Sequence, residues 1–168
     1  RLAADMHRPS QDGKPLDGPF PVLLQRTPYN KSTEVRDLEA DFFAARGYVV
    51  AIQDCRGRHA SEGGFTKYIS DGPDGYDTVE WLGTQEWSDG RVGTMGGSYA
   101  GSDQSALATL DPPHLATMIV AVGASNYYHS SMRHNGALEQ RFHVYIFRMA
   151  ATSKEAATDP ALKAALEK

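Results

Sequence analysis

The sequence is poor in cysteine, in long hydrophobic runs and in clustered basic residues, and each scarcity excludes a class of protein. Cys55, the single cysteine in 168 residues, can form neither an internal disulfide nor a thiolate metal cage. The longest apolar runs, residues 48–52 and 118–122, fall far short of the roughly 18 residues that a membrane span needs. We therefore expect no membrane segment, and we expect Cys55 to be a small buried hydrophobe.

The charge balance and the composition are those of a globular protein. The 17 basic residues are scattered among 21 acidic ones, for a formal net charge of −4, so no basic stripe is available to bind nucleic acid. With glycine counted in place of tyrosine, apolar residues make up about 45% of the chain, which is enough for a packed core. We expect a soluble protein. A homo-oligomer is compatible with this composition, which does not distinguish a cytoplasmic from a secreted or periplasmic location.

Strand-like and helix-like segments alternate up to residue 123. Short apolar runs predict strands, and apolar positions three and four apart predict helices. The expected strands lie at 1–7, 21–26, 48–53, 91–95 and 118–122, and the expected helices lie at 34–46, 76–83 and 99–110. Because the strands after the first have no polar face, both faces of the sheet should be covered. This pattern predicts an α/β fold with a mostly parallel sheet.

The alternation stops after residue 123. Apolar and aromatic side chains from Leu138 to Met149 then recur at helical spacing, and residues 156–166 are rich in alanine. We predict that residues 1–125 form the α/β domain and that residues 126–168 begin a helical subdomain.

The strand predicted at 91–95 runs directly into Gly96-Gly97-Ser98-Tyr99-Ala100-Gly101 and then into a helix. A serine in such a tight turn has a strained backbone, and the residues two before and two after it crowd each other, so both must be small. Gly96 and Ala100 meet this requirement. Ser98 is therefore a candidate nucleophile, next to helix N–H groups that can stabilise an oxyanion. The alternative is that Ser98 is only a helix N-cap in a glycine-rich turn.

A second candidate residue, Tyr29, lies in the loop Thr27-Pro28-Tyr29-Asn30-Lys31. This loop follows a predicted parallel strand, so it should leave the same edge of the sheet as Ser98. The Tyr29 hydroxyl can then donate to an oxyanion alongside the backbone N–H of Tyr99. The alternative is that the Pro-Tyr loop is a packing corner.

Four motifs stand in order over about 80 residues. They are Arg26-Thr27-Pro28-Tyr29-Asn30-Lys31; Gln53-Asp54-Cys55-Arg56-Gly57 with Ser61-Glu62-Gly63 and Phe65; Trp87-Ser88-Asp89-Gly90-Arg91-Val92-Gly93; and Gly96-Gly97-Ser98-Tyr99-Ala100-Gly101. With these motifs the chain resembles the cocaine esterase-like and X-prolyl dipeptidyl peptidase-like serine hydrolases, which include α-amino-acid ester hydrolases.

The resemblance implies an α/β-hydrolase fold, incomplete in this chain. It implies that Ser98 is the nucleophile and that the Tyr29 hydroxyl and the Tyr99 N–H form the oxyanion hole. It also implies that residues 126–168 start a helical cap and that a C-terminal β-rich domain is absent here. Asp54, Arg56 and Glu62 look like a structural polar cluster at a strand end.

A serine nucleophile also needs an imidazole base and a carboxylate, which follow it in sequence in this fold. His114 precedes a strand and so belongs at the opposite edge of the sheet, and Asp103 and Asp111 lie along or beyond the helix that leads away from Ser98. The family pattern assigns His129 to the cap, and His134 and His143 look like cap-helix residues. We therefore expect the acid and the base beyond residue 168, so that this chain is an N-terminal fragment without activity of its own.

The predicted function is cleavage of an ester or amide bond in a small molecule or peptide through an acyl-enzyme on Ser98. Its predicted partners are that substrate and the remainder of its own polypeptide. Residues 125–138 contain no acidic side chain to hold a substrate ammonium, whereas the aromatic residues from Tyr127 to Tyr145 can line an apolar acyl pocket or pack a core. The alternative function is a catalytically silent α/β-hydrolase-like binding or scaffolding module. No metal, nucleotide or flavin cofactor is predicted, because the turn has no lysine and no G-x-G.

Overall fold

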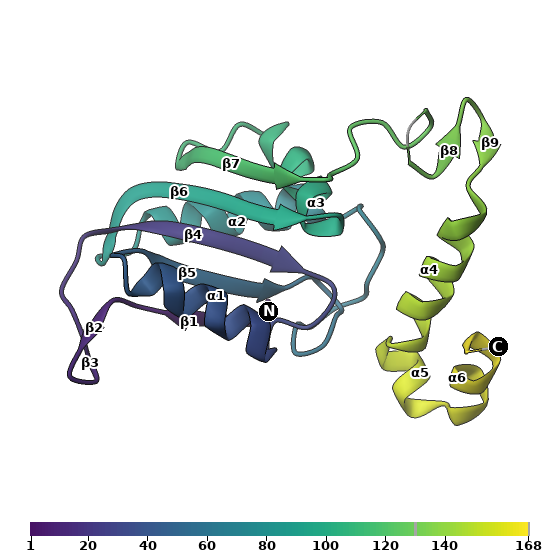
Figure 1. Ribbon diagram of the computed structural model, residues 1–168, viewed down its shortest axis with the longest axis horizontal. Helices are drawn as coiled ribbons and strands as arrows, with labels where there is room; N and C mark the ends of the chain where they lie inside the picture. The colour runs from purple at the N-terminus through teal and green to yellow at the C-terminus, as the bar shows by residue number, and fades with distance from the viewer. Residues whose placement is uncertain (130, 168) are drawn as a thin grey trace. The chain divides into compact units, whose positions relative to one another are not determined.

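Five strands pair in the order β1-β5-β4-β6-β7 in the computed structural model, which describes residues 1–129 and 131–167 (Figure 1). The strands are β1 (Ala4–His7), β4 (Phe20–Thr27), β5 (Val49–Asp54), β6 (Ser88–Gly97) and β7 (Leu115–Ala121). All pairs are parallel except that of β1 with β5, which confirms the predicted mostly parallel sheet. The arrowheads of β4 to β7 point the same way in Figure 1, so the loops after these strands share one edge of the sheet.

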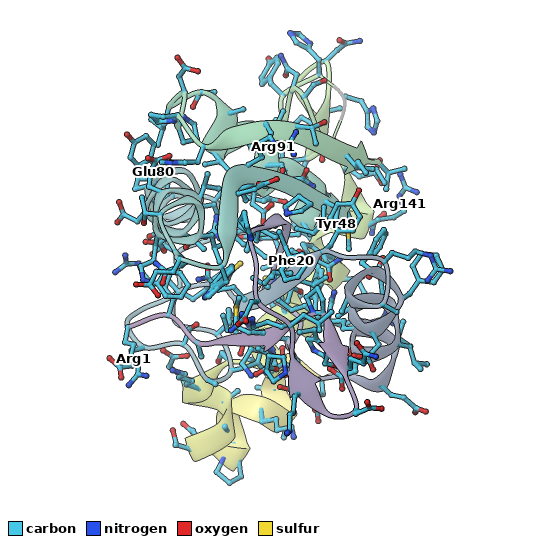
Figure 2. The ribbon with its side chains drawn as sticks, turned by 90° about the vertical axis from the view of Figure 1, so that its left-hand side faces the viewer. Arg1, Phe20, Tyr48, Glu80, Arg91 and Arg141 are labelled. Carbon is cyan, nitrogen blue, oxygen red and sulfur yellow. The ribbon has the colours of Figure 1, made fainter. Side chains whose placement is uncertain are left out.

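Three helices cover the sheet: α1 (Glu34–Ala44), α2 (Asp71–Gly83) and α3 (Tyr99–Ala108). Side chains alternate along β5, so that Val49 and Ala51 pack with α2 and α3 whereas Val50 and Ile52 pack with α1 on the opposite face. Figure 2 shows the helix that carries Glu80 on one side of the sheet. Among residues 1–129 and 131–167, no helix has the length and hydrophobicity of a bilayer span.

The edge strand β7 departs from the predicted burial on both faces. Met118, Ile119 and Val120 are 38%, 61% and 40% exposed. The reason lies in the topology, because β7 is the last strand of the sheet and β6 is its single strand neighbour within the described residues. The apolar run therefore identified a strand correctly, but full coverage of β7 was a wrong prediction for this part of the chain.

Two other boundaries differ from the sequence prediction. Helix α2 begins at Asp71 rather than at residue 76, because Pro73 is tolerated in a first helical turn and acidic side chains are favourable there. Strand β7 ends at Ala121 because Val122 has a φ of 46°, which a strand cannot contain.

The chain divides into two compact units, Arg1–Gly123 and Ala124–Lys168, with the division two residues before the predicted one. The second unit contains α4 (Gln140–Ala151), α5 (Lys154–Thr158) and α6 (Pro160–Leu166). Residues 156–166 do not form one alanine-rich helix, because Pro160 starts α6 and the side chain of Asp159 caps it.

Two short hairpins were not predicted, although the sequence carries their signals. Strands β8 (Arg133–His134) and β9 (Ala137–Leu138) are joined by Asn135-Gly136, with φ values of 50° and 93°. Strands β2 (Ser10–Gln11) and β3 (Lys14–Pro15) are likewise joined by Asp12-Gly13, with φ values of 52° and 75°. Asn-Gly and Asp-Gly are the dipeptides that best tolerate two successive positive φ angles in a hairpin turn.

Candidate active site

The chain turns sharply between β6 and α3, and Ser98 is the residue at this turn. Its φ of 58° and ψ of −115° are strained for a residue with a side chain. Gly96 has a φ of 153°, and a Cβ added to it would lie 2.6 Å from the Cβ of Ala100. The predicted crowding between the residues two before and two after Ser98 is therefore confirmed.

Backbone hydrogen bonds hold Ser98 from both sides. Its N–H donates to the carbonyl of Ala121 at the end of β7, at 2.9 Å, and its own carbonyl accepts from the N–H groups of Gly101 and Ser102, at 3.1 and 3.0 Å. Within the described residues, the Ser98 side chain makes no capping hydrogen bond to α3. Ser98 therefore occupies the N-cap position of α3 through its backbone, but its hydroxyl does not cap the helix, which argues against capping as the role of this side chain.

Tyr29 and Tyr99, the two residues predicted to form the oxyanion hole, lie against each other. Tyr29 lies in the loop after β4 and is 40% exposed, whereas Tyr99 begins α3 and is 1% exposed. Their rings meet edge to face, with centroids 6.3 Å apart. The fold thus brings together the two elements that carry the predicted oxyanion donors.

The phenol of Tyr99 is held by the first residue of α2 and by the segment just before this helix. Its hydroxyl donates to Asp71 Oδ2 at 2.6 Å and accepts from the N–H of Tyr68 at 3.2 Å. The Tyr68 ring stacks on the Tyr99 ring at 4.6 Å, and Lys67 Nζ lies 4.5 Å from the Tyr99 ring centroid. These contacts fix the orientation of Tyr99 in a buried aromatic cluster.

Arg26, near the end of β4, connects this cluster to the sheet. Its Nη1 donates to the backbone carbonyl of Asp71 at 2.6 Å, and its Nε donates to Gln53 Oε1 at 3.1 Å. Its Nη2 lies 3.9 Å from Asp71 Oδ1. Because Arg26 is 4% exposed, its charge needs such partners to remain in the interior.

Sequence reasoning quoted Arg26 as part of a motif but assigned it no role, and it missed Asp71. The reason is that the helix was predicted to start at residue 76, which left Asp71 in a loop. The run Asp71-Gly72-Pro73 was the available signal, since acidic residues and proline are typical of a first helical turn.

Burial shifts the pKa of three ionisable side chains around Tyr99. It raises the pKa of Asp71, against the opposing hydrogen bond from Tyr99 and the charge of Arg26. It raises the pKa of Asp103 on α3 to about 7, with Arg26 opposing and Asp71 adding to the shift. It lowers the pKa of Lys67 to about 7, against the charge of Asp71. Such shifts are typical of functional sites, and they also arise in buried ionic networks.

The residues predicted to form one polar cluster after β5 do not share partners. Asp54 accepts hydrogen bonds from the backbone N–H groups of Lys31 and Ala60. Arg56 pairs with Asp74 on α2, and Glu62 pairs with the N-terminal amine of Arg1 at 3.2 Å. These contacts are structural in kind, but they link the loops after β5 separately to the Lys31 loop, to α2 and to the N-terminus, so the three residues do not form the one cluster that was predicted.

Three of the four histidines considered as bases have side-chain partners of their own. His114 lies just before β7, at the opposite edge from Ser98 as predicted, and its Nδ1 is 2.8 Å from Glu80 Oε2. In the second unit, His129 contacts Asn135 and His134 contacts Glu139, while His143 lies in α4.

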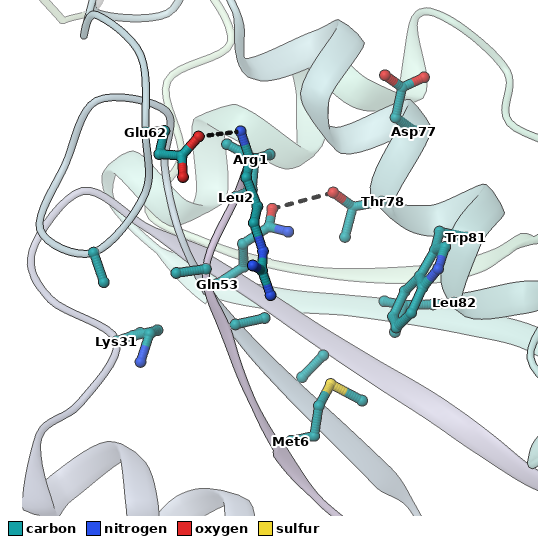
Figure 3. A pocket seen from close by; sticks show the side chains of 14 residues that line it. Arg1, Leu2, Met6, Lys31, Gln53, Glu62, Asp77, Thr78, Trp81 and Leu82 are labelled. Carbon is teal, nitrogen blue, oxygen red and sulfur yellow. Dashed lines mark hydrogen bonds and ion pairs between the residues drawn. The ribbon is translucent and has the colours of Figure 1, made fainter.

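A cavity of about 720 Å³ opens beside β1 and α2 (Figure 3). Lys31, Gln53 and Trp81 are among its lining residues, whereas Ser98, Tyr29 and Tyr99 are not. The dashed lines in Figure 3 mark the Glu62–Arg1 ion pair and the hydrogen bond from Thr78 to Gln53. This cavity is therefore separate from the Ser98 turn. In the part of the chain that the structure describes, no group of three or more His, Cys, Asp or Glu side chains is arranged to hold a metal ion.

The parallel sheet, with a strained serine between β6 and α3, defines an α/β-hydrolase, which confirms the predicted fold class. Residues 1–167 match the family X-Pro dipeptidyl-peptidase (S15 family), and the chain belongs to this family. The resemblance drawn from the four motifs is thereby confirmed.

Known relatives show how much of such a protein this chain represents. Cocaine esterase from Rhodococcus sp. is 40% identical in an alignment 135 residues long that covers 76% of this chain and 22% of the esterase. A CocE/NonD family hydrolase from Staphylococcus aureus has a solved structure that is 26% identical with a TM-score of 0.79, covering 92% of this chain and 31% of that one. An α-amino acid ester hydrolase, 22% identical with a TM-score of 0.71, shares the fold over 90% of this chain and 30% of its own. The chain thus spans less than a third of each relative's length.

Proposed function

We propose that this chain is the nucleophile-bearing part of a serine hydrolase that cleaves ester or amide bonds. The observation that carries the proposal is the geometry of Ser98, which has a φ of 58° between β6 and α3. Within the described residues, its hydroxyl makes no capping hydrogen bond to the helix. A strained serine between a buried strand and a helix, flanked by small residues, is the local geometry of a serine nucleophile in this fold class.

In the proposed mechanism the Ser98 oxygen attacks the acyl carbon of the substrate, and its proton passes to an imidazole base. The tetrahedral intermediate carries its negative charge on the former carbonyl oxygen, which accepts hydrogen bonds from the Tyr99 N–H and the Tyr29 hydroxyl. Collapse expels the protonated alcohol or amine and leaves an acyl-enzyme, which water then hydrolyses. The ring contact between Tyr29 and Tyr99 supports their assignment to one oxyanion hole.

The imidazole and its carboxylate belong, in this proposal, to the polypeptide beyond residue 168. Asp103 is buried in α3. His114 is hydrogen-bonded to Glu80 at the amino ends of the parallel strands, whereas Ser98 lies at their carboxyl ends. The second unit carries His129, which we propose as part of a cap rather than as the base.

The substrate class is an uncharged acyl group linked to an alcohol or an amine. The names of the relatives cover both leaving groups: an esterase releases an alcohol, and a peptidase of the X-Pro dipeptidyl-peptidase family releases an amine. The absence of acidic residues from 125–138 in the sequence argues against recognition of a substrate ammonium there.

The test is labelling with a fluorophosphonate, followed by intact mass and peptide mapping. The complete polypeptide that contains this sequence should gain one adduct on Ser98, and the 168-residue chain alone should gain none. Ser98→Ala should abolish the adduct, whereas the matched variant Ser105→Ala on the same helix should keep it. Absence of an adduct in the complete polypeptide would leave the silent binding module as the function. An adduct in the short chain would place the base within it, with His129 the first residue to replace.

A further inference from the structure

We propose that Asp71 is a positioning residue that fixes the two segments carrying the oxyanion donors relative to each other. We call these segments the two arms of the oxyanion hole: the start of α3, and the end of β4 with the Tyr29 loop. This inference rests on the proposed function, because it assigns a role relative to the Tyr29 and Tyr99 donors. Asp71 touches neither the substrate nor the reacting atoms in this proposal, and it acts through Tyr99 and Arg26.

The first arm is the start of α3, which carries the Tyr99 N–H. Ser98 has strained backbone angles, so the direction of the next N–H depends on how the Tyr99 side chain is anchored. Asp71 Oδ2 accepts the Tyr99 hydroxyl at 2.6 Å, and Tyr99 is 1% exposed. A short hydrogen bond to a carboxylate in a dry interior is among the stronger neutral-to-charged contacts that a side chain can make.

The second arm is the end of β4, which leads into the Tyr29 loop. Arg26 lies three residues before Tyr29 in the sequence, and its Nη1 donates to the Asp71 carbonyl at 2.6 Å. The same aspartate therefore binds the α3 arm through its side chain and the β4 arm through its backbone. The edge-to-face contact of Tyr29 with Tyr99 also joins the two arms directly.

The location of Asp71 makes it a rigid support. It is 4% exposed and it is the first residue of α2, a helix of 13 residues. A carboxylate in the first turn interacts favourably with the helix dipole, and this interaction restrains it further. Displacing such a support would move the oxyanion donors without removing them.

The experiment compares the wild-type complete polypeptide with Asp71→Ala, Tyr99→Phe and the double variant. Tyr99→Phe keeps the backbone N–H and the ring but loses the hydrogen bond to Asp71. We expect kcat for an ester substrate to fall by roughly 10- to 100-fold in each variant, with KM nearly unchanged, because misplaced oxyanion donors weaken only the transition state. Affinity for a boronic acid that adds to Ser98 should fall in parallel. The double variant should be no worse than the worse single variant, because both changes break the same contact.

The matched control is Asp74→Asn, which changes another buried acid in the first turn of α2, one that pairs with Arg56 instead. It should lose stability while kcat stays at the wild-type value. Wild-type kcat in a folded Tyr99→Phe variant, or a loss confined to KM, would overturn the positioning role. Failure of the wild-type polypeptide to react with a fluorophosphonate would overturn the proposed function itself, so the two failures are distinguishable.

Discussion

Gly96 and Ala100 face each other across the Ser98 turn so closely that only one of them can carry a methyl group. A Cβ added to Gly96 would lie 2.6 Å from the Ala100 Cβ and 2.8 Å from the Ala100 carbonyl oxygen. The backbone of Gly96, at a φ of 153°, is itself one that side chains rarely adopt. The turn that presents Ser98 therefore requires glycine, a residue without a side chain, at position 96.

Gly96→Ala should destabilise the complete polypeptide by about 3 kcal/mol, through the clash with Ala100 and the unfavourable φ. Urea denaturation of the wild type and the variant measures this loss. Gly64→Ala is the matched control, since a Cβ there has open space and should change stability by less than about 0.5 kcal/mol. Equal stability of the two variants would contradict the crowding argument.

Ser98→Gly should be more stable than Ser98→Ala by roughly 1 kcal/mol, because glycine adopts the backbone angles of this turn without strain. Both variants remove the proposed nucleophile, so both should lose hydrolysis and fluorophosphonate labelling. Thermal unfolding of the pair isolates the strain from the effect of the lost hydroxyl. A more stable alanine variant would show that the turn does not strain residue 98.

Asp103→Asn should change how stability depends on pH. Burial raises the pKa of Asp103 to about 7, so between pH 4 and pH 7 the folded protein holds a proton that the unfolded chain releases. The contribution of Asp103 to stability therefore falls as pH rises through this window. Relative to the wild type, the unfolding free energy of the variant should rise by on the order of 3 kcal/mol between pH 4 and pH 8. A difference between Asp103→Asn and the wild type that stays flat across this range would contradict the prediction.

Lys67→Met should show the opposite trend at higher pH. Burial lowers the pKa of Lys67 from its ordinary 10.5 to about 7, so between these values the unfolded chain holds a proton that the folded protein lacks. The contribution of Lys67 to stability therefore rises with pH from 7 to 10.5. The unfolding free energy of the variant relative to the wild type should fall by about 1 kcal/mol across this window, after allowance for solvent screening. Denaturation at pH 7 and pH 10 tests this, with the exposed Lys14→Met as control, and a difference between variant and wild type that stays constant with pH would contradict it.

Local chemistry explains why so much of the fold was predictable. The apolar run of β5 and its alternation between two helical layers follow from side-chain direction along a strand. The turn at Ser98 follows from the small residues Gly96 and Ala100 around it, whose contact spans four positions of the chain. Where the prediction missed local features, as at the Asn135-Gly136 hairpin, the signal was present and was not used.

Other features had no local signal. The exposure of Ile119 on β7 depends on which strands pair beside it, and its own apolar neighbours in the sequence indicated burial. The separate partners of Arg56 and Glu62 likewise depend on where α2 and the N-terminus lie. Residues that stand close together in a sequence motif therefore do not share one cluster in the folded structure.

The sequence by itself determined the α/β class, the candidate nucleophile Ser98 and the family, because these depend on short-range sterics and on motifs in a fixed order. Only the tertiary structure decided what supports the site. The Tyr99–Asp71 hydrogen bond joins residues 28 positions apart, and the Arg26–Asp71 bond joins residues 45 positions apart. Such pairs form when the strands and helices pack, and their energy comes from excluding water around polar groups, which no single segment can do alone.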